Sequence, residues 1–321
     1  MRKRTRYSLL IALALLGALV VAILLRKNAP PEVARLLPES DGILYLNLTP
    51  IRLITKLDQK AITPTPDYQK FIDATGFLFE RDLDAVAFSL HRMDNPNGPN
   101  GPVAYSEVFE GRFDGKRLSD YLRSISSSTE NYAGHEIFTV PIENRKLRVT
   151  TLGYDMVAAS NMPTAEQIHS ILDRYRASAS PFSGSSLLGE HYSSVPLLSF
   201  AWGIGQIGLP LTESGNMSID GVQLPLPQDA TFVASARFVS SLRLRVEEIA
   251  ANEQAASRDA GNMNMLLTLF RGFELNQARS AEDTVLLEAL ANAKIEQKKE
   301  RAVLTSTISL DALRRASNNQ K

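Results

Sequence analysis

The sequence predicts an α+β protein in which an N-terminal transmembrane helix precedes mainly antiparallel sheets packed with helices, with signs of two related halves. Three observations predict this class. An uncharged apolar run stands near the N-terminus, strand-like and helix-like apolar patterns are mixed after it, and short turns join most expected strands. A Leu-Pro segment that occurs twice indicates the two halves.

The apolar run Tyr7–Leu25 contains 19 residues and no charge. At about 1.5 Å rise per residue a helix of this length spans roughly 28 Å, close to the hydrocarbon thickness of a bilayer. Four basic residues precede the run and Arg26 and Lys27 follow it. The larger basic cluster predicts that the N-terminus is cytoplasmic and that the domain after residue 27 is extracytoplasmic, at a bacterial inner membrane.

A cleaved signal peptide is the alternative for this segment. Its basic start and apolar centre would look similar, but small residues normally precede the cleavage site. Here Leu24, Leu25, Arg26 and Lys27 occupy those positions, so the sequence favours an uncleaved signal-anchor. The chain has no cysteine, which excludes a lipoprotein anchor, and whether the segment is cleaved stays open.

Composition limits the function classes. Of 35 basic residues, six lie in the first 27 positions and none of the 35 acidic residues do, so residues 28–321 carry a net charge of −6. An acidic domain does not suit nucleic acid and gives no overall attraction to anionic lipid. The lack of cysteine excludes disulfides, thiolate nucleophiles and cysteine-ligated metals.

Element boundaries follow from alternation, helical periodicity and turn residues. A proline-containing stalk precedes a well-buried strand, and a helix starts at Thr49-Pro50. The other expected helices are residues 68–76, 116–125, 164–175 with a capping box formed by Thr164 and Gln167, 253–270, 281–291, and a short one capped by Ser309. The expected strands are residues 43–48, 84–91, 103–113, 136–140, 146–152, 156–160, 197–202, 231–238, 242–247, 294–296 and 302–308.

A long glycine- and proline-rich stretch suggests the internal boundary. The expected organisation is a cytoplasmic tail at 1–6, a transmembrane helix at 7–25, a stalk at 26–35, a first α+β half at 36–202, an irregular connection at 203–227 and a second α+β half at 228–321.

The anchor followed by Leu37-Pro38-Glu39-Ser40-Asp41 and Tyr45 resembles a broad group of bacterial membrane-anchored envelope proteins of unknown function. Leu226-Pro227-Gln228-Asp229 repeats the Leu-Pro entry, although Ala234 stands where the second copy would have an aromatic residue. The closing hairpin with Ile295 and the segment from Val303 to Ser306 is also similar. The resemblance implies a location at the envelope and no catalytic residues.

Two motifs suggest ligands and fail on context. Gly203 to Gly208 matches the GxGxxG dinucleotide fingerprint, but Pro210 follows where a helix is needed, so we expect a loop. The turn-rich segment from Asp94 to Gly101 has Pro96 and Gly98 where a calcium loop needs oxygen ligands, so we expect a hairpin turn.

Scattered polar residues offer no catalytic pattern. The four histidines are not at helical metal-ligand spacing, no serine lies in a GxSxG elbow, and Ser183, Ser185 and Ser186 have linker composition. Trp202 is expected in the core or an interface. The stripe Met263, Met265, Leu266, Leu269 and Phe270 suits either a protein-binding surface or a helix core, and the helix core is the preferred interpretation. The candidates that could converge in an enzyme are Glu80, Asp82, His91, His135 and His169, with Asp84 on the same strand entry as Asp82.

The sequence therefore favours an uncharacterised single-pass envelope protein whose extracytoplasmic domain binds or scaffolds a partner, with no catalytic, cofactor or metal residue assigned. The expected contacts are the bilayer through Tyr7–Leu25 and an envelope protein or a second copy of the chain. Two alternatives stay open: an envelope hydrolase acting on cell-wall or lipid material, and a carrier of lipid or another hydrophobic ligand.

Overall fold

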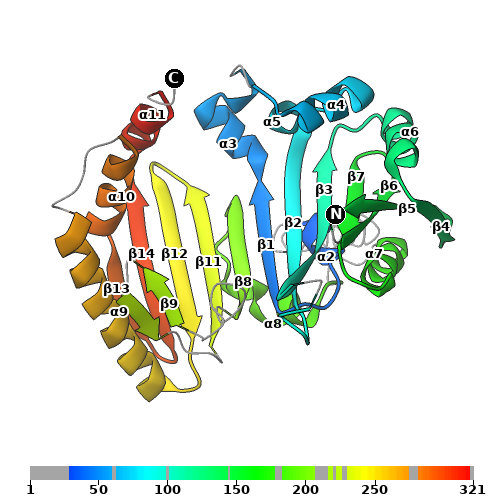
Figure 1. Cartoon of the computed structure of the whole chain (residues 1–321). Coiled ribbons are helices and arrows are strands. Elements are labelled where there is room, and N and C mark those ends of the chain that lie inside the picture. The colour runs from blue at the N-terminus through cyan, green and yellow to red at the C-terminus, as the bar shows by residue number, and fades with distance from the viewer. Residues whose placement is uncertain are drawn as a thin grey trace, which may run out of the picture.

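The computed structural model describes residues 29–59, 63–98, 101–143, 145–177, 183–206, 216–219, 222–225, 230–274 and 281–318. In this part of the chain twelve strands form one continuous sheet, in which all neighbouring strands are antiparallel (Figure 1). The order across the sheet is β13-β14-β12-β11-β8-β1-β2-β3-β7-β6-β5-β4. A separate hairpin consists of β9 and β10. Mixed helices and antiparallel strands confirm the α+β class.

The strands are β1 Gly42–Asn47, β2 Leu83–Arg92, β3 Val103–Gly111, β4 Ser128–Tyr132, β5 His135–Ile142, β6 Arg145–Leu152, β7 Met156–Ser160, β8 Ala201–Gln206, β9 Asn216–Ile219, β10 Val222–Pro225, β11 Thr231–Phe238, β12 Leu242–Ile249, β13 Lys294–Lys298 and β14 Arg301–Ile308. The helices are α2 Glu32–Arg35, α3 Leu48–Thr55, α4 Pro66–Thr75, α5 Phe79–Asp82, α6 Gly115–Ile125, α7 Glu166–Arg176, α8 Ser186–His191, α9 Glu253–Glu274, α10 Ala281–Ala291 and α11 Leu310–Asn318, with 3-10 turns at Leu57–Gln59 and Tyr192–Ser194.

The two faces of the sheet are named by adjacent residues of the central strand β1. Successive side chains of a strand point to opposite faces, and residues paired across strands share a face. The Ile43 face carries Ile43 and Tyr45, and the Leu44 face carries Leu44 and Leu46. Cross-strand pairing extends this assignment to every strand of the sheet.

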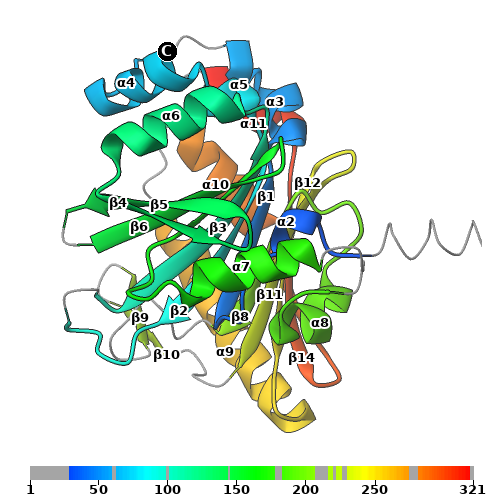
Figure 2. The ribbon, with the colours of Figure 1, turned by 90° about the vertical axis from the view of Figure 1, so that its right-hand side faces the viewer.

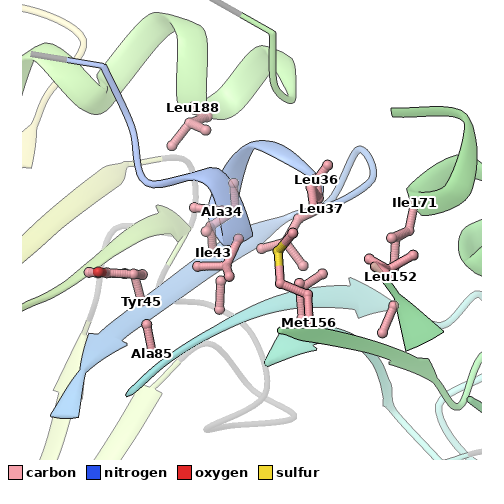
Figure 3. Close-up of a cluster of buried hydrophobic side chains, with 14 of the residues drawn as sticks. Ala34, Leu36, Leu37, Ile43, Tyr45, Ala85, Leu152, Met156, Ile171 and Leu188 are labelled. Atoms are coloured by element: carbon pink, nitrogen blue, oxygen red, sulfur yellow. The ribbon is translucent and has the colours of Figure 1, made fainter. Parts of the chain in front are cut away.

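The main hydrophobic core lies on the Ile43 face under α2, α7 and α8 (Figures 2 and 3). Side chains of the α2 segment and of α7 meet the strands there, as Figure 3 shows for Leu36, Leu37, Ile43, Met156 and Ile171. Burial of these side chains is the main stabilising contribution to this half of the sheet.

The Leu44 face is covered at its two ends. At one end α6 packs Leu118 and Leu122 on β5, β6 and β7, in a second cluster that contains Phe138. At the other end α9 and α10 contact β13 and β14, and the Ser306 hydroxyl donates to the Ala289 carbonyl oxygen at 2.5 Å. Figure 1 shows the middle strands between these two groups of helices.

The α2 segment corrects the expected stalk. Residues 26–28 lie outside the described residues, but Glu32–Arg35 forms a helix whose Val33 and Ala34 are fully buried. Apolar side chains of the segment enter the core on the Ile43 face, so it belongs to the folded domain. Proline was a misleading signal here, because Pro31 stands at the N-cap, just before the first helical turn, where its missing N–H removes no intrahelical hydrogen bond.

The irregular connection expected over residues 203–227 is also corrected in part. Residues 203–206 complete β8, which pairs with β1 on one side and β11 on the other. The sheet therefore continues across the predicted boundary between the halves. Glycines weaken strand propensity, but here each lies between two neighbouring strands that supply the backbone hydrogen bonds.

The predicted membrane span Tyr7–Leu25 and the tail before it lie outside the described residues. Within the part of the chain that the structure describes, none of the helices combines the length and the apolar character needed to cross a bilayer.

Candidate functional site

A single row of paired residues on the Leu44 face crosses all twelve strands. Its members are nearly all apolar or glycine, and one is acidic. From β13 to β4 the row contains Ile295, Leu304, Val246, Ala234, Gly203, Leu44, Phe88, Glu107, Ala159, Val149, Phe138 and Thr129.

The middle of this row is accessible to solvent. Leu44 is 48% exposed, Ala234 is exposed, and Phe88 is half-buried. Half-buried apolar side chains also lie in the rows above and below it: Leu46, Leu90, Tyr105, Phe109, Ala236, Phe238 and Leu244. We call the part of the Leu44 face on β11, β8, β1, β2 and β3 the open face. Leu44 and Ala234 leave apolar surface accessible in the middle of the sheet, which makes the open face the candidate site.

Small residues of β8 shape the centre of the open face. A Cβ atom at Gly203 would lie 2.7 Å from the Cδ2 atom of Leu44, so the Leu44 side chain lies across Gly203. A Cβ atom at Gly205 would lie 2.7 Å from the Cα atom of Gly42. The two glycines are therefore explained by the close packing of β8 on β1. The loop that we expected for residues 203–206 from the GxGxxG motif is a strand instead. Gly208 lies outside the described residues.

Glu107 is the acidic residue in the middle of the row. Its neighbours across the strands are Phe88 and Ala159, and its neighbours along β3 on the same face are Tyr105 and Phe109. Burial against these groups raises the pKa of Glu107 to about 7. At neutral pH the open face therefore carries a carboxyl group that gains and loses its proton easily.

A histidine and three serines form a hydrogen-bonded network on the opposite, Ile43 face. His91 Nε2 lies 3.0 Å from the Ser106 hydroxyl and 3.2 Å from that of Ser89, and the Ser106 and Ser160 hydroxyls are 3.0 Å apart. Burial lowers the pKa of His91. Ser89 and Ser106 are completely buried, so this network satisfies polar groups inside the core and presents no accessible nucleophile.

The other enzyme candidates lie apart from His91. Glu80 accepts a hydrogen bond from the Tyr68 hydroxyl at 2.8 Å, and Asp82 is paired with Arg81 and Arg112 next to the start of β2. Asp84 is paired with Arg52 of α3. These carboxylates fix α3, α4 and α5 against the strands.

His135 and His169 come close to one tyrosine. The ring of His169 stacks on Tyr132 at 3.8 Å between centroids and its Nε2 lies 2.8 Å from Glu130, while Tyr132 pairs with His135 across β4 and β5. His191 lies 3.7 Å from its neighbour Glu190. Within the described ranges no group of three or more potential ligands could hold a metal ion.

The remaining candidates have structural explanations. Trp202 is buried against Tyr45 and Tyr192, and Ser185 accepts a hydrogen bond from the Leu188 amide as the N-cap of α8. The hairpin turn expected after Asp94 joins β2 and β3. The side chains of Ser183 and Ser186 contact Arg35 and Glu39 respectively.

The apolar stripe of α9 corrects the helix-core prediction in part, because Met263, Leu266 and Phe270 are half-buried. Met265 and Leu269 are 60% and 46% exposed, whereas Ala256, Ala260 and Leu267 are buried. The helix packs on the sheet through its alanines, which allow the closest approach. Burial, together with the nearby Asp259, raises the pKa of the fully buried Glu248 to about 7. Neither carboxyl oxygen of Glu248 has a hydrogen-bond partner within the described residues.

Glu107 is the residue of the candidate site that the sequence patterns did not single out. One signal could have found it: the alternation of β3 places this charge between Tyr105 and Phe109, on the face that otherwise carries aromatic residues.

Comparisons with known proteins give no family. No family model and no curated protein matches the sequence. The fold is similar to crystal structures of TP0453. Form I is 12% identical, with 89% of this chain and 96% of that chain covered and a TM-score of 0.44, and form IV is 13% identical, with 90% and 96% covered and a TM-score of 0.46. At these scores the likeness carries no argument about function.

Proposed function

We propose that the chain is a membrane-anchored binding domain whose open face holds the apolar chain of a lipid-like molecule. The observation that carries the proposal is the accessible apolar row through Leu44 and Phe88 in the middle of the sheet. Transfer of apolar surface from water yields about 25 cal/mol per Å², so an alkyl chain lying across several strands gains substantial binding free energy.

The arrangement of helices supports an elongated ligand. Helices α6 and α9–α10 stand at the two ends of the Leu44 face and leave its middle strands between them (Figure 1). Helices α3 and α11 contact each other. The aromatic rings of Phe88 and Phe109 meet edge to face at 6.2 Å and provide a firm apolar platform. A long chain lying along the row would contact β11, β8, β1, β2 and β3 in turn.

The proposal includes a location. The basic residues before Tyr7–Leu25 support a cytoplasmic N-terminus and an extracytoplasmic domain at a bacterial inner membrane. A domain held there by an anchor would meet lipids and other amphiphiles at high local concentration.

The test uses the full-length chain in lipid nanodiscs and a long-chain fatty acid that carries a photoreactive diazirine. Crosslinked peptides are identified by mass spectrometry. Labelling of peptides from β1, β2 and β3 is expected, and Leu44→Gln should reduce it about tenfold, because burying an unpaired amide costs roughly 1–3 kcal/mol.

Ile142→Gln is the matched control, since Ile142 is 47% exposed at the end of β5, away from the open face. It should leave labelling unchanged. Labelling confined to Tyr7–Leu25, or equal in both variants, would contradict the proposal.

A further inference from the structure

Three large apolar side chains stand in water at neighbouring turns. Leu197 and Leu198, which precede β8, are 62% and 90% exposed, and Val239, in the turn between β11 and β12, is 62% exposed. The two turns lie side by side: the rings of Phe200 and Phe238 stack at 4.5 Å, and the Phe200 amide donates to the Ala236 carbonyl oxygen at 3.0 Å. We call Leu197, Leu198 and Val239 the apolar tip.

Leu198 occupies a backbone conformation that does not favour leucine. Its φ is +64°, in the left-handed region that glycine adopts most easily. The Ser199 hydroxyl donates to the Pro196 carbonyl oxygen at 2.7 Å and closes the turn. A glycine would relieve the strain, and a polar residue would relieve the exposure. Leu198 therefore carries two separate free-energy costs, one for its strained backbone and one for its exposed apolar side chain.

Basic residues lie next to the apolar tip. On β11 and β12, Arg237 and Arg243 are directly opposite each other, an arrangement in which like charges destabilise a sheet. Neither has an ion-pair partner among the described residues.

The charged residues on the Ile43 face of β11–β14 are mostly basic. Six of its residues are positively charged and two are negatively charged: Arg237, Arg243, Arg245, Lys294, Lys298 and Arg301, against Glu247 and Glu296. Both acidic residues are engaged, Glu247 with Arg245 and Arg301 at 2.5 Å each, and Glu296 with Lys298 at 2.8 Å. The basic residues nearest the tip therefore keep their charge available for an external anion.

The turn between β11 and β12 lies on the side from which the chain enters the domain. Figure 2 shows α2, the first described helix, and the turn at the start of β12 on the same side of the sheet. Upstream of α2 lie the described residues from Ala29 and then the segment that contains the apolar run Tyr7–Leu25. An attachment through that run would hold the domain within reach of a lipid surface on this side.

We propose that the apolar tip inserts into the interface of a bilayer that contains anionic lipid, and that Arg237 and Arg243 bind the lipid head groups. Apolar side chains flanked by arginine suit the boundary between head groups and acyl chains. The contact orients the domain on the membrane. It is separate from ligand binding on the open face, and either proposal can fail without the other.

The absence of cysteine allows a single-site test on the full-length chain. Val239→Cys and Leu198→Cys are labelled with a bimane fluorophore and reconstituted in vesicles that carry a spin-labelled quencher near the head groups. Met265→Cys is the matched control, because Met265 is 60% exposed on α9. Quenching at positions 198 and 239 should exceed quenching at 265, and phosphatidylglycerol should increase it relative to vesicles of phosphatidylcholine alone.

Two further variants separate the two parts of the contact, both in the Val239→Cys background. Arg237→Gln with Arg243→Gln should lower the phosphatidylglycerol-dependent quenching by roughly fivefold or more, the factor expected for one basic residue near an anionic surface. Leu198→Gly should lower quenching with the fold retained, as shown by unchanged fluorescence of Trp202. Quenching at 198 and 239 no greater than at 265 would overturn the membrane contact. Quenching that is independent of phosphatidylglycerol would overturn head-group recognition.

Discussion

The two faces of the sheet are buried in different places. On β1–β7 the Ile43 face is covered by α2 and α7, and on β13 and β14 the Leu44 face is covered by α9 and α10. From one end of the sheet towards its middle the main helical cover thus moves from the Leu44 face to the Ile43 face, and α6 covers the Leu44 face again at β5, β6 and β7. Two regions keep accessible side chains, and they differ in chemistry: the open face is apolar, whereas the end of the Ile43 face that carries Arg237, Arg243 and Lys294 is basic.

The covered and the accessible parts of the sheet are expected to contribute differently to stability and to binding. A side chain under a helix contributes its full transfer free energy to folding, whereas a half-exposed apolar side chain contributes less and keeps surface available for a ligand. Adjacent residues of β1 show it directly, since Ile43 is fully buried and Leu44 is 48% exposed. Substitutions at such pairs can test whether the two faces play different roles.

The largest expected effect is at Ile43. Ile43→Ala should lower the free energy of unfolding by about 2–5 kcal/mol, because it leaves a cavity under α2. Leu44→Ala should lower it by about 1 kcal/mol or less, since its side chain is half exposed. Urea unfolding of the full-length protein in detergent, followed by Trp202 fluorescence, measures both. Equal losses at the two positions would mean that the open face is covered in solution.

A second, smaller effect depends on pH at Glu107. The pKa of Glu107 is raised from 4.5 to about 7 in the folded protein, so the folded state binds the proton more tightly than the unfolded state. Its ionisation therefore lowers stability progressively as pH rises from about 4.5 to 7. Glu107→Gln should be more stable than the wild type at pH 8 by about 1–3 kcal/mol and nearly equal to it at pH 4.5.

An exposed carboxylate provides the control for this experiment. Glu190→Gln, at an exposed position of α8, should change the unfolding free energy by less than about 0.5 kcal/mol at either pH. A difference between Glu107→Gln and wild type that stays constant from pH 4.5 to pH 8 would show that the Glu107 carboxyl is well hydrated.

Local patterns predicted most strands. The expected bounds of 156–160 and 231–238 agree with β7 and β11, because alternation and turn residues act over a few neighbouring positions. Strand β4 was missed, since Ser128–Tyr132 is polar and mostly exposed at the edge of the sheet and carries no apolar alternation. Edge strands with this composition avoid pairing with other chains.

The binding surfaces could not be predicted in this way. Both faces of β1 are apolar in sequence, which predicted a well-buried strand, but which face a helix covers depends on chain segments far away. Average charge was equally uninformative. A net charge of −6 over residues 28–321 gave no reason to expect a basic face, yet strand register gathers six positive charges on one face of β11–β14.

The smallest expected effect compares the starts of two helices, one beside each face. The Asp114 carboxylate accepts hydrogen bonds from the amides of Lys116 and Arg117 at 3.1 Å and caps α6, which covers one end of the Leu44 face. The capping box expected at Thr164 does not form, because Ala165 is the N-cap of α7 and makes no side-chain bond. Asp114→Ala should therefore lower the free energy of unfolding by about 1 kcal/mol, and Thr164→Ala by much less. Urea midpoints measured in parallel test the pair. A loss at Thr164 as large as at Asp114 would mean that α7 is capped in solution and that the two helices hold their faces equally firmly.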